Sequence, residues 1–136
     1  MTRTVGITVF PEFFQTEGVE AVLDNLVGRA HATAIATSPY VMEVADAATG
    51  TREPPIDAGA GSVRLLDRPL WGKRELFVRT APSFVPDRSL YRGLRYQPPT
   101  PDALTQRHGT MIARAIAAAK ARGLAVHLQV QAAIPP

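Results

Sequence analysis

Carboxylates and an aromatic hydroxyl follow the ends of two short apolar segments. Glu12 lies two residues beyond the segment 4–10, and Tyr40 and Glu43 follow the segment 32–37. A carboxylate can exchange protons or accept hydrogen bonds from hydroxyls, and a tyrosine offers a ring for stacking and a hydroxyl for bonding. These residue types favour a site for a polar ligand. The alternatives are a solvated loop glutamate at 12 and a ring packed beneath other residues at 40.

Two glutamines share one side of the last apolar segment, 124–130. Alternation along this segment places aliphatic side chains on one face and His127, Gln129 and Gln131 on the other. Buried amides need hydrogen-bond partners, which a barrel lumen or a polyhydroxylated ligand would supply. We expect Gln129 to be a structural glutamine. Gln131, nearer the strand end, is a candidate for ligand binding.

Other site chemistries find little support in the sequence. There is no cysteine, which excludes disulfides, thiolate metal sites and thiol catalysis. The three histidines, His31, His108 and His127, fall in three different predicted elements without ligand-like spacing. No glycine-rich phosphate loop follows a strand, and no Gly-x-Ser-x-Gly motif occurs. We therefore predict no metal site and no cofactor.

Positive charge is concentrated in the middle of the chain. The 136 residues have a formal net charge of +3, and eight basic residues stand against three acids between Arg64 and Arg95. Such a stretch can meet phosphate, carboxylate or nucleic acid. The alternative is that these arginines are solvated or pair with carboxylates within the protein. Because no nucleic-acid motif and no register of stacked aromatic and basic residues accompanies them, we predict no nucleic-acid partner.

Three strands and two helices are predicted to position these candidates. The apolar segments predict strands at 4–10, 32–37 and 124–130. After a loop over 12–18, an apolar stripe from Val19 to Val27 predicts the first helix. The second helix is predicted to begin at Thr100 as N-cap, with Pro101 in its first turn, and to end before Gly123. His31, between a helix and a strand, is expected to adopt a left-handed backbone conformation.

Residues 41–100 interrupt this pattern and are predicted to be a proline-rich insertion. Eight of the twelve prolines lie between Pro54 and Pro101, and no clear periodicity is present. The only tryptophan of the chain lies here, which favours an ordered excursion over a flexible linker. The segment Arg74–Arg79 is predicted to be a short extra strand.

The order strand, helix, strand, insertion, helix, strand predicts an α/β fold with a parallel sheet. Three parallel strands leave two open edges, and two helices cannot cover both sheet faces. We therefore predict that residues 1–136 are a single N-terminal segment of a truncated parallel (β/α) barrel. The competing interpretation is a complete small α/β domain that dimerises through its sheet edges.

Several segments resemble the opening of glycoside-hydrolase-like TIM barrels: TVGITVFPEFF at 4–14, GVEAVLDNL at 18–26, ATAIATSPY at 32–40 and AIAAAKARGLAVHLQVQ at 115–131. The resemblance implies a carbohydrate substrate and a sugar cleft that includes the insertion. The expected substrate-binding residues at this cleft are Glu12, Tyr40, Glu43, Arg79, Tyr96 and Gln131. In this family the catalytic carboxylates lie on later strands, which are missing here. The catalytic residues are therefore unknown, and we expect no complete active site.

Two other functions remain open at this point. A sugar-phosphate isomerase or epimerase-like barrel would use the arginines for phosphate. A noncatalytic module would bind an acidic partner through Arg64–Arg95. The start of the chain has no long apolar stretch, and nowhere do 18 apolar residues run together, so we predict a cytoplasmic protein without a membrane partner. The expected partners are the missing C-terminal barrel strands, or a second copy that pairs through open sheet edges.

Overall fold

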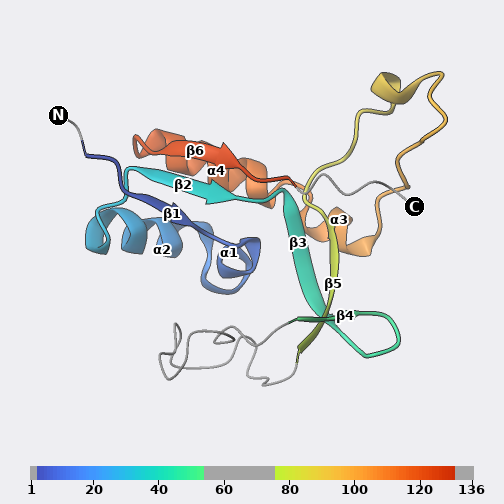
Figure 1. The fold of residues 1–136 in the computed structure, drawn as a ribbon, viewed down its shortest axis with the longest axis horizontal. Helices are drawn as coiled ribbons and strands as arrows, with labels where there is room; N and C mark the ends of the chain where they lie inside the picture. The colour runs from blue at the N-terminus through green and yellow to red at the C-terminus, as the bar shows by residue number, and fades with distance from the viewer. Residues whose placement is uncertain (1–2, 54–75, 131–136) are drawn as a thin grey trace. The chain divides into compact units, whose positions relative to one another are not determined.

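The computed structural model describes residues 3–53 and 76–130. The chain divides into two compact units (Figure 1). The first, called the parallel-sheet unit, comprises Met1–Val41 and Ala81–Pro136. The second, called the ribbon unit, comprises Met42–Thr80.

The parallel-sheet unit is built on three strands, β1 (Gly6–Thr8), β2 (Ala34–Thr37) and β6 (Ala125–Leu128). They run in the order β1-β2-β6, and β2 pairs in parallel with both neighbours (Figure 1). The register places Ile7, Ile35 and Val126 side by side. The prediction of a parallel sheet within an α/β fold is thus confirmed. The described strands do not form a closed barrel.

One face of this sheet is packed against helices. Ile35 is buried in a core with Leu23, Ile112 and Ala115, and Ile7 and Val126 pack against the same core. The register puts Ile7, Ile35 and Val126 on one face because side chains alternate along each strand. Helix residues and the aliphatic row of the sheet therefore form one continuous core.

The opposite face of the sheet is lined by small and polar residues and is open. Gly6, Thr8, Ala125 and His127 are exposed, whereas in the middle strand Ala36 is half-buried and Ala34 is buried. Within residues 3–53 and 76–130, the helices therefore cover one face of the sheet only. Right-handed crossovers between strands that are added in sequential order place their helices on the same side, which explains this arrangement.

The segment predicted as a loop over 12–18 is a helix, so that prediction was wrong. Helix α1 (Pro11–Glu17) begins at Pro11, whose fixed φ suits the first helical position. Gly18, with φ 88°, separates it from α2 (Val19–Asp24), and the π-helical turn η1 (Asn25–Arg29) continues α2. Strand β1 ends at Thr8, before the predicted end at residue 10, and Pro11 starts the helix.

The second predicted helix is divided in two, α3 (Ala103–His108) and α4 (Met111–Ala121). The hydroxyl of buried Ser83 lies at the break: it donates to the His108 carbonyl (2.6 Å) and accepts from the Ile112 N–H (3.3 Å). These bonds replace backbone bonds that the interruption leaves unmade. Only a glycine fits at position 109, because a Cβ there would lie 2.6 Å from the Thr105 carbonyl oxygen.

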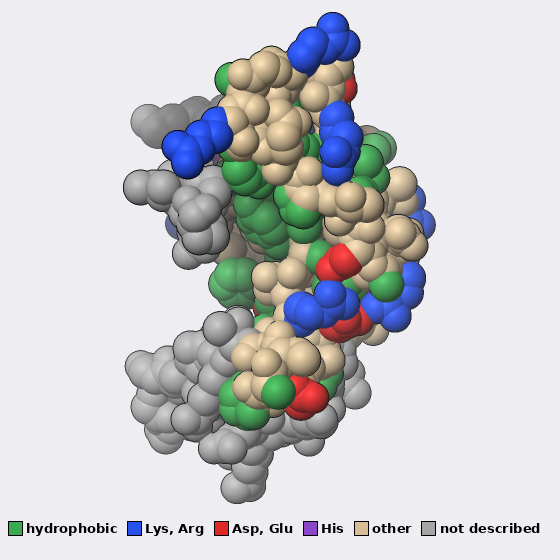
Figure 2. Space-filling view, turned by 90° about the vertical axis from the view of Figure 1, so that its right-hand side faces the viewer, with side chains coloured by type: hydrophobic (Ala, Val, Ile, Leu, Met, Phe, Trp, Pro, Cys, Tyr) green, Lys and Arg blue, Asp and Glu red, His purple; other side chains and the backbone are tan. Residues whose placement is uncertain are grey.

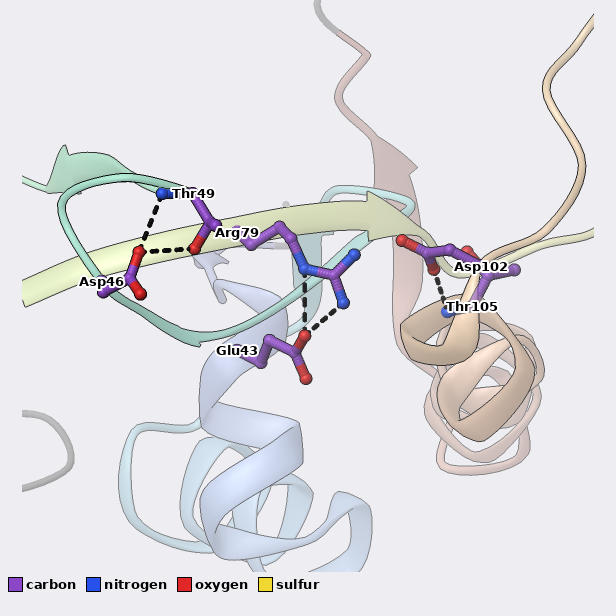
Figure 3. Close-up of polar contacts among 6 residues, drawn as sticks. All are labelled: Glu43, Asp46, Thr49, Arg79, Asp102 and Thr105. Carbon is purple, nitrogen blue, oxygen red and sulfur yellow. Dashed lines mark hydrogen bonds and ion pairs between the residues drawn. The ribbon is translucent and has the colours of Figure 1, made fainter.

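The N-cap of this region is Asp102 rather than Thr100, and Pro101 precedes the helix. The Asp102 carboxylate accepts from the Thr105 N–H at 2.9 Å (Figure 3). A carboxylate both bonds the N–H and complements the helix dipole. The predicted cap was therefore wrong by two residues.

Two further joints connect the helices and strands, and one of them was predicted. His31 has φ 52°, which confirms its left-handed conformation. Arg122, after the end of α4, donates to Asp24 (2.5 Å) and also pairs with Glu20, so it links α4 to α2. The hydrogen bonds that Arg122 donates to Asp24 and then to Glu20 raise its pKa above the usual value.

The segment 41–100 contains strands that the lack of periodicity concealed. Strands β3 (Tyr40–Ala45), β5 (Leu76–Pro82) and β4 (Thr51–Glu53) form a second sheet in the order β3-β5-β4, and β4 and β5 are antiparallel. Strand β5 confirms the predicted extra strand at Arg74–Arg79 and starts two residues later. A 3-10 turn, η3 (Arg88–Tyr91), follows.

The described helices are short, and none combines the length with the apolar character that crossing a lipid bilayer requires.

The packed face of the parallel sheet makes a stability prediction. Leu23 is fully buried in the core, so Leu23→Ala should lower the free energy of unfolding by about 3 kcal/mol through lost burial and a cavity. Leu94 is exposed, so Leu94→Ala should change it by less than about 0.5 kcal/mol. Urea denaturation followed by circular dichroism at a fixed protein concentration measures both. Equal losses for the two variants would contradict the assigned core.

Candidate functional site

The carboxyl ends of the three parallel strands meet at one edge of the sheet, called the carboxyl edge. It is formed by the residues after β1, the end of β2 and the residues after β6. Backbone hydrogen bonds hold it together: the Val9 N–H donates to the Ala36 carbonyl (2.8 Å), and the Gln129 N–H donates to the Thr37 carbonyl (2.7 Å). Ligand sites of parallel α/β folds lie at such edges because the connecting loops converge there.

Glu12 is placed near this edge by the early start of α1. It is the second residue of the helix, directly after the segment that follows β1. The side chain is half-buried, and its Oε2 atom is removed from solvent. Its carboxylate is in the first turn, where the helix dipole favours negative charge. The helix that the sequence reading missed is thus the element that orients this candidate.

Thr37 is a polar residue of the carboxyl edge that the sequence reading did not select. It ends β2 with 1% of its surface exposed, and its Oγ1 has no hydrogen-bond partner among the described residues. A buried hydroxyl without a partner is costly. Thr37 follows Ile35 by two residues and therefore shares its helix-covered face. A threonine that closes an otherwise apolar strand was the available sequence signal.

The remaining candidates of the parallel-sheet unit differ in exposure. Tyr40, the first residue of β3, is half-buried, and Gln129 is exposed. Gln131 lies outside the described residues. Leu128 and Val130, which belong to the aliphatic face of this segment, are exposed. The core contacts of the segment are made by Leu124, just before β6, and by Val126.

Glu43 and Arg79 are brought together in the ribbon unit (Figure 3). Glu43 lies on β3 and Arg79 on β5, and the guanidinium donates from Nε to Oε1 at 3.0 Å and also from Nη2. About a third of each side chain is exposed. The pair joins neighbouring strands across the sheet, so both residues have a structural role that accounts for their charge.

Asp46 makes a second polar cluster in the ribbon unit, which the sequence reading missed. Its Oδ1 accepts from the N–H of Ala48 (3.0 Å) and from the N–H (2.9 Å) and hydroxyl (2.8 Å) of Thr49 (Figure 3). The Thr49 hydroxyl, followed by its N–H, lowers the pKa of Asp46 below 3.8. This is a turn-stabilising carboxylate.

Tyr96, the last candidate, lies in the segment after β5. It is exposed, and its ring pairs with that of Tyr91 at a centroid distance of 6.1 Å and an angle of 56°. The geometry is a tilted aromatic pair of ordinary separation.

Metal chemistry has no visible support in the described parts of the chain. No three His, Asp or Glu side chains converge there to a metal-binding cluster.

Comparison of the chain with protein-family models, with curated proteins and with solved structures finds no match. The residues of the site are therefore the only basis for a functional proposal.

The Asp46 turn makes a pH prediction. Its pKa lies below 3.8, so its stabilising contribution is complete above that pH and is lost as the pH falls through the folded-state value. Thr49→Val removes the hydroxyl donor and should raise the pKa of Asp46 toward 3.8, whereas Thr110→Val on α4's N-cap should leave it unchanged. Carbon-detected NMR titration of the Asp46 carboxylate measures this. An unchanged value in Thr49→Val would contradict the assigned cause.

The ion pair makes a coupling prediction. A double-mutant cycle with Glu43→Gln and Arg79→Gln should give a coupling energy of about 0.5 to 1 kcal/mol, as expected for a partly exposed pair. Urea denaturation of the four proteins measures it. Additive effects of the two substitutions would show that the pair contributes nothing to stability.

Proposed function

We propose that this chain forms the N-terminal part of a carbohydrate-binding (β/α) barrel and contributes part of the sugar cleft. The observation that supports this most is the arrangement of the parallel sheet. Its strands follow one another in sequence order, with all packed helices on one face. A barrel is wound in this way, since its helices lie outside and the opposite face lines the interior. In the doubly wound order 2-1-3-4-5 the strand order reverses within the first three strands, whereas the order β1-β2-β6 does not reverse.

The open face and the open edges of the sheet support further strands as partners. Strands β1 and β6 each pair with β2 only among the described strands. Such edges are sites for additional strands. The exposed Thr8 and His127 and the small Gly6 and Ala125 suit a lumen that other strands complete. A second copy that pairs through the same edges is the other way to cover them.

The chemistry of the carboxyl edge supports a polyhydroxylated ligand. It offers a half-buried carboxylate (Glu12) and a half-buried aromatic ring with its hydroxyl (Tyr40) within the parallel-sheet unit. Carboxylate and hydroxyl groups bond sugar hydroxyls, and an aromatic ring packs on the apolar face of a sugar. Glycoside hydrolysis requires two carboxyl groups about 5 to 10 Å apart. We therefore assign Glu12 to binding, and the parent enzyme's catalytic pair to further strands.

A sugar-phosphate isomerase-like barrel is supported less well. That function would use arginines for phosphate, but Arg79 is held by Glu43. Arg88 donates to the Pro98 carbonyl at 3.1 Å, so it too has a structural bond. Binding of a sugar without a phosphate group requires neither arginine as a ligand.

Binding is tested by NMR titration of the 136-residue chain with a panel of α- and β-linked oligosaccharides. At least one sugar should shift the backbone signals of Thr37 and Gln129. Glu12→Gln and Tyr40→Ala should weaken its binding about tenfold, a loss of about 1.4 kcal/mol. Glu17→Gln, at the end of the same helix, is the matched control and should bind like the original chain. Saturating sugars without any shift at the carboxyl edge would contradict the proposal.

The proposal that the chain is only a segment of a barrel is tested separately, by size-exclusion chromatography and by assay on aryl-glycosides. The open edges predict self-association at micromolar concentrations, and the missing carboxylate predicts no hydrolysis. A monodisperse monomer that hydrolyses an aryl-glycoside would refute the barrel-segment account even if sugar binding were observed.

A further inference from the structure

Residues 84–96, called the basic–apolar loop, carry several large apolar side chains that are exposed. Leu90 and Val85 are 75% and 67% exposed. Three more residues of the loop are exposed to a lesser degree: Phe84, Leu94 and Tyr96. Single exposed apolar residues are ordinary, but several within one short segment indicate an interaction surface.

This loop is nevertheless held in one conformation by its own hydrogen bonds. Asp87 caps η3 and accepts from the N–H (2.9 Å) and hydroxyl (2.7 Å) of Ser89. The Gln97 amide donates to the carbonyls of Tyr91 (2.7 Å) and Leu94 (2.8 Å), which closes the end of the loop. A loop already ordered loses less conformational entropy on binding, so its exposed side chains are presented to a partner at low cost.

Arginines alternate with the apolar residues along the loop. Arg88, Arg92 and Arg95 are exposed, and Asp87 is the only acidic residue between positions 84 and 96. Figure 2 shows Lys and Arg side chains at the top of the view, over the segment around η3, with hydrophobic side chains beside them. The surface is therefore both apolar and positively charged.

The alternation of arginines with apolar side chains favours a protein partner over a membrane or a nucleic acid. A membrane-inserting loop keeps its cations beside the apolar tip, because burying an arginine in hydrocarbon costs at least about 2.5 kcal/mol. Here Arg92 lies between Leu90 and Leu94, so insertion of both leucines would draw the cation inward. Single-stranded nucleic acid favours stacked aromatic rings, whereas the two most exposed apolar residues are the aliphatic Leu90 and Val85. A protein segment offers carboxylates and apolar side chains side by side, which matches both features.

We propose that the basic–apolar loop binds an acidic protein segment whose carboxylates alternate with apolar side chains. The leucines and valine contact the apolar side chains, and Arg92 and Arg95 pair with the carboxylates. Arginine and tyrosine are enriched in protein interfaces, in keeping with this composition. The site is distinct from the carbohydrate proposal and does not depend on it. The small area of one loop predicts a weak, transient complex.

The probe is a fluorescent synthetic peptide in which Glu alternates with Leu and Phe, titrated with the full 136-residue chain in an anisotropy assay. Binding should be saturable and should weaken as salt is raised, because charge attraction contributes. The double variants Arg92→Gln/Arg95→Gln and Leu90→Ser/Leu94→Ser should each weaken binding at least about fivefold. Arg114→Gln, an exposed arginine on α4, is the matched control and should have no effect.

Three outcomes would overturn the proposal. One is the absence of binding at millimolar protein. Another is equal binding of a peptide in which Lys replaces Glu. The third is loop-dependent binding to vesicles of phosphatidylserine and phosphatidylcholine that is stronger than binding to the peptide. Circular dichroism of the variants should match that of the original chain, since all substituted side chains are exposed.

Discussion

The burial of one face of a three-stranded parallel sheet is the constraint on which the parallel-sheet unit depends. Ile35, on the central strand, is almost completely buried and aligned with Ile7 and Val126. Leu23 from α2 and Ala115 from α4 complete the same core. Because side chains alternate, fixing this register also fixes which residues lie on the opposite face and which loops meet at the carboxyl edge. Packing on one side thus determines where the candidate site lies.

Outside this core, hydrogen bonds and an ion pair order the strands, turns and loops. Glu43 with Arg79 joins two strands of the ribbon unit, and Asp46 closes a turn there. Asp87 and Gln97 shape the basic–apolar loop in the same manner. Such contacts order a segment without burying much apolar surface, which leaves side chains such as Leu90 available for a partner. We accordingly propose sugar binding at the packed sheet and protein binding at the basic–apolar loop.

The sequence predicted the elements whose signal is local periodicity. The parallel sheet, the helix that ends before Gly123 and the left-handed His31 all follow from patterns within a few residues. It missed α1, which occupies the predicted loop over 12–18, and it missed the α3–α4 break, which depends on Ser83 at a distance in the sequence. The buried hydroxyl of Thr37 was missed for the same reason, since burial is a tertiary property. Gln131 stays a prediction because it lies outside the described residues.

The barrel proposal depends on strands that follow one another in sequence order with helices on one side only. The most direct measurement is a set of nuclear Overhauser contacts between backbone protons of the three strands in isotope-labelled protein. The account predicts contacts between Ile7 and Ile35 and between Ile35 and Val126, and none between Ile7 and Val126. Direct contacts between β1 and β6 would mean that the strand order reverses, which would contradict both the one-sided core and the barrel proposal that depends on it.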